Sequence, residues 1–140
     1  MPKRRVSRKE KEIVMERISN ILKAKPYVMF SYIFGSFVTE CPFKDIDIGI
    51  YISNMGAISP LKLELKIESE IEEVIHCPTD IRIINHAPLS FIYNILKGGI
   101  LIVDRDKSLR ADFEGLVYKK YFDFRHLRTE YLKEIINAPI

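Results

Sequence analysis

Three aspartates and one glycine–serine step are the residues of this sequence best suited to chemistry. Asp45 and Asp47 stand two positions apart, so on a β-strand their side chains share a face, roughly 6–7 Å apart along the strand. Hard divalent cations prefer carboxylate oxygens, and two such ions about 4 Å apart stabilise the attacking and leaving oxygens of phosphoryl transfer. The pair predicts a two-metal site; the alternative is an edge strand whose carboxylates only face solvent.

Gly35 and Ser36 follow directly on a segment rich in aromatic and β-branched residues. Glycine lets the backbone approach a phosphate closely, and the following amides and the serine hydroxyl can donate hydrogen bonds to phosphate oxygens. A simple turn is the alternative for this dipeptide alone. A strand, a Gly-Ser step, a short loop and a strand carrying Asp45 and Asp47 together indicate a nucleotide phosphate site.

Asp80 is the candidate for a third acid. It begins a short alternating segment, Thr79-Asp80-Ile81-Arg82-Ile83, and a neighbouring strand would place it beside the first two carboxylates. There it could hold one metal ion and accept the proton of an attacking hydroxyl. Its alternative role is a polar cap at the start of a strand.

Hydrophobic spacing predicts the elements that must position these acids. We expect helices over residues 7–25, 60–75, 88–97 and 108–137, the last in one or two pieces, and strands over residues 27–34, 45–52, 80–85 and 100–103. Ser7 and Glu10 have the spacing of a capping box, and Ser59 before Pro60 suits a helix start. Residues 61–67 also alternate as a strand would, but their charges and the proline favour helix.

This order of elements predicts an α/β (α+β) fold in which a small mixed sheet of about four strands is flanked by helices. The 140 residues suit one domain, 1–140, and the composition, 47% hydrophobic and 29% charged, is that of a folded soluble protein. We expect a cytoplasmic location, since no apolar run resembles a signal peptide or a membrane span.

The predicted last helix carries more aromatic residues than one buried stripe requires. We expect most of them to be core and some to form a partner surface; the residues are Phe113, Val117, Tyr118, Tyr121, Phe122, Phe124 and Tyr131.

The run from Gly35-Ser36 to Asp45-Ile46-Asp47-Ile48-Gly49-Ile50 resembles the signature of the DNA polymerase β-like nucleotidyltransferase superfamily. The small size resembles its minimal nucleotidyltransferases (MNT), including the antitoxin halves of HEPN–MNT toxin–antitoxin pairs. Residues 85–104 are similar to the helix and strand that follow in that family.

The resemblance implies that Gly35 and Ser36 bind the triphosphate of ATP, and that Asp45, Asp47 and Asp80 are the catalytic and metal-binding acids for two Mg²⁺ ions. It also implies transfer of AMP from ATP to a tyrosine hydroxyl of a HEPN toxin, which this chain would bind and neutralise as a homo- or hetero-oligomer. Nucleic acid is not expected as the direct substrate.

Only eight residues separate Ser36 from Asp45, fewer than is usual in the family. The shorter loop motivates an alternative from another class, a weakly catalytic or non-catalytic module that neutralises a HEPN ribonuclease by occlusion. A small-molecule nucleotidyltransferase acting on an antibiotic is a third alternative. Such enzymes carry a helical C-terminal domain, which we do not expect here.

Overall fold

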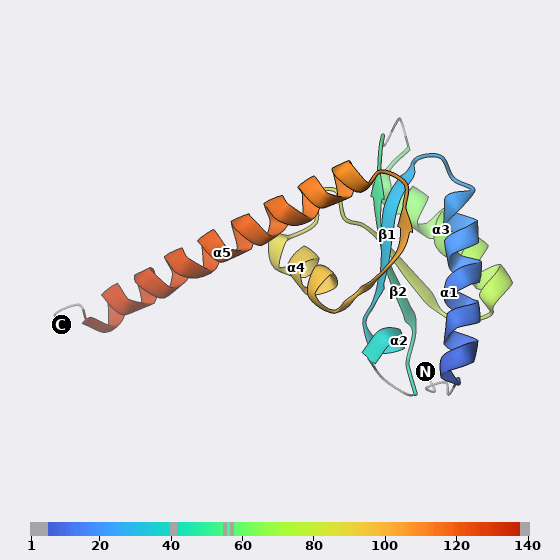
Figure 1. Ribbon diagram of the computed structural model, residues 1–140, viewed down its shortest axis with the longest axis horizontal. Coiled ribbons are helices and arrows are strands. Elements are labelled where there is room, and N and C mark those ends of the chain that lie inside the picture. Colours follow the sequence, from blue (N-terminus) through green and yellow to red (C-terminus); the bar gives the residue numbers. More distant parts are fainter. Residues whose placement is uncertain (1–5, 40–41, 55, 57, 138–140) are drawn as a thin grey trace.

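The computed structural model describes residues 6–39, 42–54, 56 and 58–137 (Figure 1). Its helices and strands alternate nearly as the sequence predicts. They are α1 (Arg8–Lys23), β1 (Val28–Phe34), α2 (Ser36–Thr39), β2 (Ile46–Ile52), α3 (Pro60–Ile75), β3 (Thr79–Ile83), α4 (Leu89–Gly98), β4 (Ile100–Asp104) and α5 (Lys107–Asn137).

The four strands form one mixed sheet in the order β3-β2-β1-β4. β1 pairs antiparallel with β2 and with β4, whereas β2 and β3 run parallel. The crossover between the parallel strands is α3, as expected for a connection that must return the chain to the same end of the sheet. The predicted mixed sheet flanked by helices is therefore confirmed.

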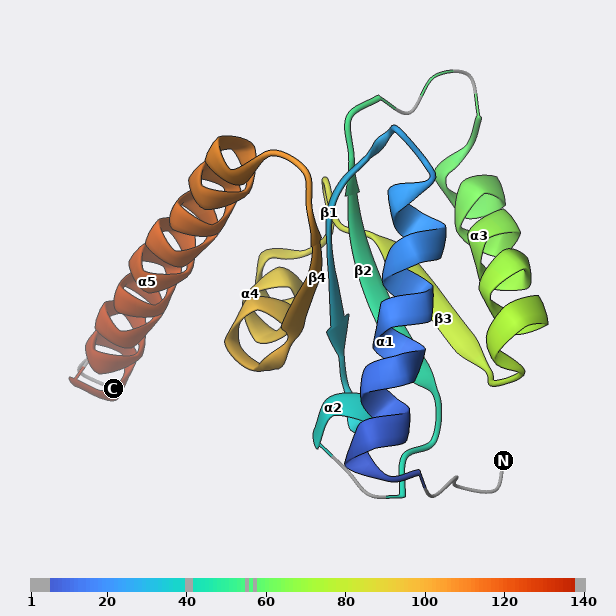
Figure 2. The ribbon, with the colours of Figure 1, turned by 45° about the vertical axis from the view of Figure 1, so that its right-hand side comes forward.

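Helices cover both faces of the sheet (Figure 2). The α1 and α3 side buries the alternate isoleucines of β2 together with Ile18, Leu22 and Ile67. The α4 and α5 side buries a second cluster that includes Phe30, Tyr32, Ile92, Ile95 and Val117. Because side chains alternate along a strand, the residues of β2 between the isoleucines, Asp47 among them, face the α4 side.

The predicted helix starts are confirmed at two serines. Ser7 caps α1, and its Oγ accepts a hydrogen bond from the backbone N–H of Glu10 (3.1 Å). Ser59 caps α3 in the same way through the N–H of Lys62 (3.2 Å). The short α2 was not predicted, and α5 takes the first of its two expected forms, one uninterrupted helix of 31 residues.

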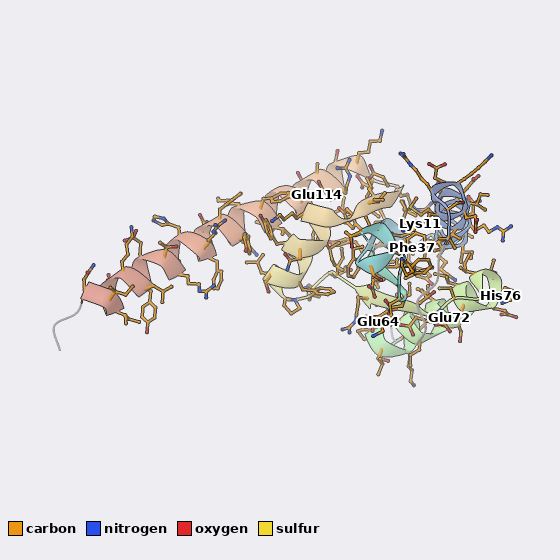
Figure 3. All side chains as sticks on the ribbon, turned by 90° about the horizontal axis from the view of Figure 1, so that it is seen from below. Lys11, Phe37, Glu64, Glu72, His76 and Glu114 are labelled. Carbon is orange, nitrogen blue, oxygen red and sulfur yellow. The ribbon has the colours of Figure 1, made fainter. Side chains whose placement is uncertain are left out.

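The outer edge of β3 is covered by a row of glutamates on α3. Glu72, Glu68 and Glu64 accept hydrogen bonds from the backbone N–H groups of Thr79, Ile81 and Ile83, at 2.9, 2.9 and 2.8 Å. The spacing of the glutamates along α3 matches the spacing of the N–H groups along β3, because four residues of helix advance about 6 Å and two residues of strand nearly 7 Å. Figure 3 shows Glu64 and Glu72 on α3. The row satisfies an edge that would otherwise present unpaired donors beside the site.

Replacing Glu68 by alanine should lower the free energy of unfolding by about 1–2 kcal/mol, because the N–H of Ile81 loses its acceptor in a partly buried position. Glu68→Gln retains a side-chain oxygen as acceptor and should cost far less. Urea denaturation of both variants measures the difference. Equal losses in the two variants would contradict a role for the hydrogen bond.

The aromatic residues of α5 divide at the middle of the helix. Val117 is buried, and Phe113, Tyr118 and Tyr121 are partly buried against the body, which accounts for most of the predicted core residues. Phe122, Phe124 and Tyr131 are 56, 55 and 62% exposed. Among the described residues, no helix is long and apolar enough to cross a membrane.

Candidate active site

The sheet brings the three predicted acids together at one end. Asp47 pairs in register with Asp80 across the parallel β2–β3 ladder, and with Phe34, the last residue of β1, on its other side. Residues in register on adjacent strands share a face. Asp45 lies two residues before Asp47, at the entry to β2. The three carboxylates therefore lie on the α4 side, where β1 ends and β2 and β3 begin.

Gly35 lies directly against Asp47. Its φ of +78° falls in the left-handed region, and the Oδ2 of Asp47 occupies the place that a Cβ on this residue would take. Only glycine meets both conditions without strain. In this structure the backbone of Gly35 approaches a carboxylate, and its approach to a phosphate stays a prediction.

Ser36 holds the loop between the turn and Asp45. Its Oγ accepts a hydrogen bond from the backbone N–H of Lys44 (3.1 Å) and donates to the carbonyl of Asp45 at 3.4 Å. The hydroxyl therefore spans the short loop that leads into β2. The second of these hydrogen bonds is long, so a phosphate oxygen could replace the carbonyl as acceptor.

The charges of the site act on Asp47 most strongly. Burial in the first place, then the negative charges of Asp45 and Asp80, raise the pKa of Asp47 to about 6, while Arg82 opposes the shift. Arg82 lies 3.6 Å from Asp80, Nε to Oδ2.

The carboxylate donors suit a divalent cation. Their mutual repulsion is the electrostatic condition that a bound cation relieves. In the described part of the chain, however, no three His, Cys, Asp or Glu side chains are gathered closely enough to hold an ion in their present positions. Asp45, Asp47 and Asp80 would therefore have to draw together around it.

Two hollows are lined by Phe91 of α4, and each also includes a neighbour of one carboxylate, Gly35 in the first and Arg82 in the second. The first, about 240 Å³, is lined by residues that include Gly35, Thr39, Phe91 and Asn94. The second, about 300 Å³, is lined by Glu64, Arg82, Ile83, Ala87, Pro88 and Phe91. The sequence reasoning missed Phe91 and Asn94, although their spacing of three on the predicted helix 88–97 already placed them on one side of it.

The metal-free protein should lose stability as the pH rises through the pKa of Asp47. That pKa is about 6 in the folded protein and 3.8 ordinarily. The Asp47 carboxyl group therefore makes its full contribution to the free energy of unfolding below about pH 4. This contribution is lost as the pH rises past 6. Asp47→Asn removes the titration and should be more stable than the parent by about 1 kcal/mol at pH 7, a value reduced for solvent screening, with little difference at pH 4.

Thermal unfolding in a chelating buffer across this pH range measures the effect. Added Mg²⁺ should then raise the melting temperature of the parent at pH 7 and leave Asp47→Asn unchanged, since ligand binding to the folded state stabilises it. Parallel pH profiles of the two proteins would contradict the assignment of this titration to Asp47.

A mixed sheet whose central hairpin sets a left-handed glycine against one of three carboxylates at the same end of the strands is the arrangement expected of the nucleotidyltransferase class of α/β proteins. The sequence profile of one family, the polymerase beta nucleotidyltransferases, matches residues 16–108. The chain belongs to that family. A search of curated protein sequences finds no significant match.

Solved structures share the fold over nearly their whole length. One is a complex of a tri-AMPylated HEPN toxin with an MNT antitoxin from Shewanella oneidensis, similar to this chain with a TM-score of 0.69, 13% identity and coverage of 90% of this chain and 98% of the other. The toxin–antitoxin MntA–HepT has a TM-score of 0.67 and 13% identity, with coverage of 89% of this chain and 98% of the other. A toxin–antitoxin structure with AMP-PNP has a TM-score of 0.59 and 17% identity, with coverage of 94% of this chain and 98% of the other. At these identities the likeness is one of fold.

Proposed function

We propose that this protein transfers AMP from ATP to a tyrosine hydroxyl of a partner HEPN toxin and thereby acts as its antitoxin. The observation that carries the proposal is the in-register pair Asp47 and Asp80, with Asp45 beside it and Gly35 packed on the Asp47 carboxylate. Family membership and the similar structures support it, since one of those contains a tri-AMPylated toxin and another an ATP analogue.

In this mechanism the three aspartates would hold two Mg²⁺ ions, which when bound neutralise charge on the triphosphate and on the leaving pyrophosphate. The amides after Gly35 and the hydroxyl of Ser36 donate hydrogen bonds to phosphate oxygens. Asp80, whose side chain is 45% exposed, accepts the proton of the attacking hydroxyl. The hydroxyl oxygen then forms a bond to the α-phosphorus, and the bond from that phosphorus to pyrophosphate breaks.

The test combines this protein, ATP, Mg²⁺ and the product of the neighbouring gene, which the proposal expects to be a HEPN protein. Intact-mass measurement should show the HEPN protein heavier by one or more AMP groups, and peptide mapping should place them on tyrosine. A HEPN protein of unchanged mass, in the presence of a complex with this chain, would overturn the transfer.

The short loop between Ser36 and Asp45 favours a second candidate, neutralisation by occlusion with a weak nucleotide site. A variant with Asp45→Ala and Asp47→Ala separates the two functions. Loss of neutralisation together with loss of AMP transfer supports catalysis. Full neutralisation by this variant supports occlusion.

A further inference from the structure

The first hollow, near the end of β1, has an apolar floor and a polar rim. It measures about 240 Å³ and is lined by residues of β1, α2 and α4, and α4 lies beside β1 (Figure 2). Its floor is formed by Ile95, which is 1% exposed, and by the half-buried rings of Phe34 and Phe91. The exposed side chains of Thr39 and Asn94 form part of the rim. Sites for small molecules commonly combine an apolar lining with a few polar groups in this way.

The first hollow adjoins the carboxylate site through two glycines. Gly35 lines the hollow, and the same residue packs on the carboxylate of Asp47. Gly49 follows Asp47 by two positions, so both lie on the same face of β2. A Cβ on Gly49 would lie 3.5 Å from the Cδ1 of Ile95 and 3.8 Å from the Cε1 of Phe34. The floor of the hollow therefore packs over the face of β2 that carries Asp47.

The position of the first hollow indicates what occupies it. Under the proposed function, the phosphates of ATP bind at Gly35, at Ser36 and at the metal ions. The sugar and the base must extend from that point, and the hollow begins at the same glycine. Its volume of about 240 Å³ is below the roughly 300–1,000 Å³ of pockets that enclose a whole drug-sized ligand. It therefore suits one planar ring system rather than a complete nucleotide.

The second hollow is a poorer place for a base. It is lined by Glu64 and Arg82 as well as by Phe91, and Arg82 lies 3.6 Å from Asp80. Under the proposed function Asp80 accepts a proton from the attacking hydroxyl, so the acceptor occupies this side. A base placed here would also remove two charged side chains from water, at a cost that the apolar floor of the first hollow avoids.

Phe91 offers a stacking surface in the first hollow. Its ring is held edge-to-face against that of Phe34, with centroids 5.7 Å apart and planes at 87°. Aromatic side chains stack on nucleic acid bases with little preference among them, because every base has a π-face. The ring of Phe91 would therefore contribute affinity for a nucleotide without choosing between bases.

Asn94 offers the choice between bases. A side-chain amide carries a donor and an acceptor side by side. Asn85 of this protein uses both at once, on the N–H and the carbonyl of Ile52, at 3.0 and 2.7 Å. Adenine presents the complementary pair, an amino donor beside a ring-nitrogen acceptor, whereas the corresponding edge of guanine carries two acceptors. The amide of Asn94 would therefore pair at two points with adenine and at one with guanine.

We propose that the first hollow binds the base of the nucleotide, with Phe91 stacked on the base and Asn94 selecting adenine over guanine. The inference rests on the proposed function for the position of the phosphates. It assigns base specificity to α4, a helix that carries none of the five site residues predicted from the sequence.

The test measures binding of ATP and of GTP, each with Mg²⁺, to the full chain by isothermal titration calorimetry. We expect the parent to bind ATP at least about tenfold more tightly than GTP. Asn94→Asp replaces the donor with a second acceptor, which suits the two donors on another edge of guanine. The ratio of ATP affinity to GTP affinity should therefore fall at least about tenfold in this variant.

Ser90→Asp is the matched control for the added charge. Ser90 is exposed, lies one turn before Asn94 on α4 and is outside the lining of both hollows. Its replacement should leave the ratio of the two affinities within about twofold of the parent. Phe91→Leu keeps an apolar side chain on the floor and should weaken ATP and GTP alike, by at least about fivefold, with the ratio unchanged.

A parental ratio in Asn94→Asp would overturn the inference, as would an equal change of the ratio in Ser90→Asp. Parental affinities in Phe91→Leu would overturn it as well. Asn94 is exposed, so its variant should keep the parental melting temperature and remain informative if Phe91→Leu unfolds. Binding is measured without the acceptor protein. A chain that shows the expected affinities but transfers no AMP would therefore contradict the proposed function and leave this inference intact.

Discussion

AMP transfer by the Asp47→Asn protein should fall by at least about a thousandfold. Asp47 is the central carboxylate of the three, in register with Asp80 on one side and packed against Gly35 on the other. Asparagine keeps the shape of the side chain but removes the negative charge that would bind a metal ion. Single-turnover kinetics with saturating ATP and Mg²⁺, read as mass gained by the HEPN protein, measures the loss.

The other acids should give a different pattern. Asp80→Asn should depress transfer while ATP binding persists, because Asp80 is proposed to act on the acceptor hydroxyl; Asp45→Asn should weaken both. Glu68→Gln is the matched control, since this acid lies near Asp80 but bonds the backbone of β3. Transfer by Asp47→Asn within about tenfold of the parent would contradict a metal-dependent mechanism at this site.

Gly35→Ala is the second change with a large expected effect. It should lower the free energy of unfolding by roughly 2–3 kcal/mol and transfer by about a hundredfold. The residue has a φ of +78°, which disfavours any side chain, and the new methyl group would displace the Asp47 carboxylate. Urea denaturation and the same transfer assay measure the two losses.

Gly56→Ala provides the control for the backbone. The φ of Gly56 is +60°, and a Cβ there meets no atom within 4 Å. Gly56→Ala should therefore cost only the conformational penalty of about 1 kcal/mol, without a clash. Transfer should remain at the parental level. In an Asp47→Ala background the stability cost of Gly35→Ala should shrink toward that of Gly56→Ala, because the clash is removed. An undiminished cost in that background would contradict the contact with Asp47.

Local patterns in the sequence were sufficient for most of the fold. The alternation of Ile46, Ile48 and Ile50 correctly separated the buried face of β2 from the face that carries Asp47. Ser7 and Ser59 correctly marked the starts of α1 and α3. These signals are readable because caps and side-chain periods depend on neighbours within a few residues. The short α2 was missed because four residues between a turn and a loop carry no period.

The sequence by itself determined the residue types of the site and the strand that carries two of its acids. The tertiary structure decided that Asp80 lies beside Asp47, since the register of two strands 33 residues apart depends on how α3 packs between them. It also decided the raised pKa of Asp47, which comes from burial first and then from the negative charges of neighbouring Asp45 and of Asp80 on another strand. Such properties arise from contacts between residues on different strands, which the side-chain periodicity of a single segment does not describe. For the same reason only the folded chain shows where the apolar side of α5 leaves the body and becomes a surface.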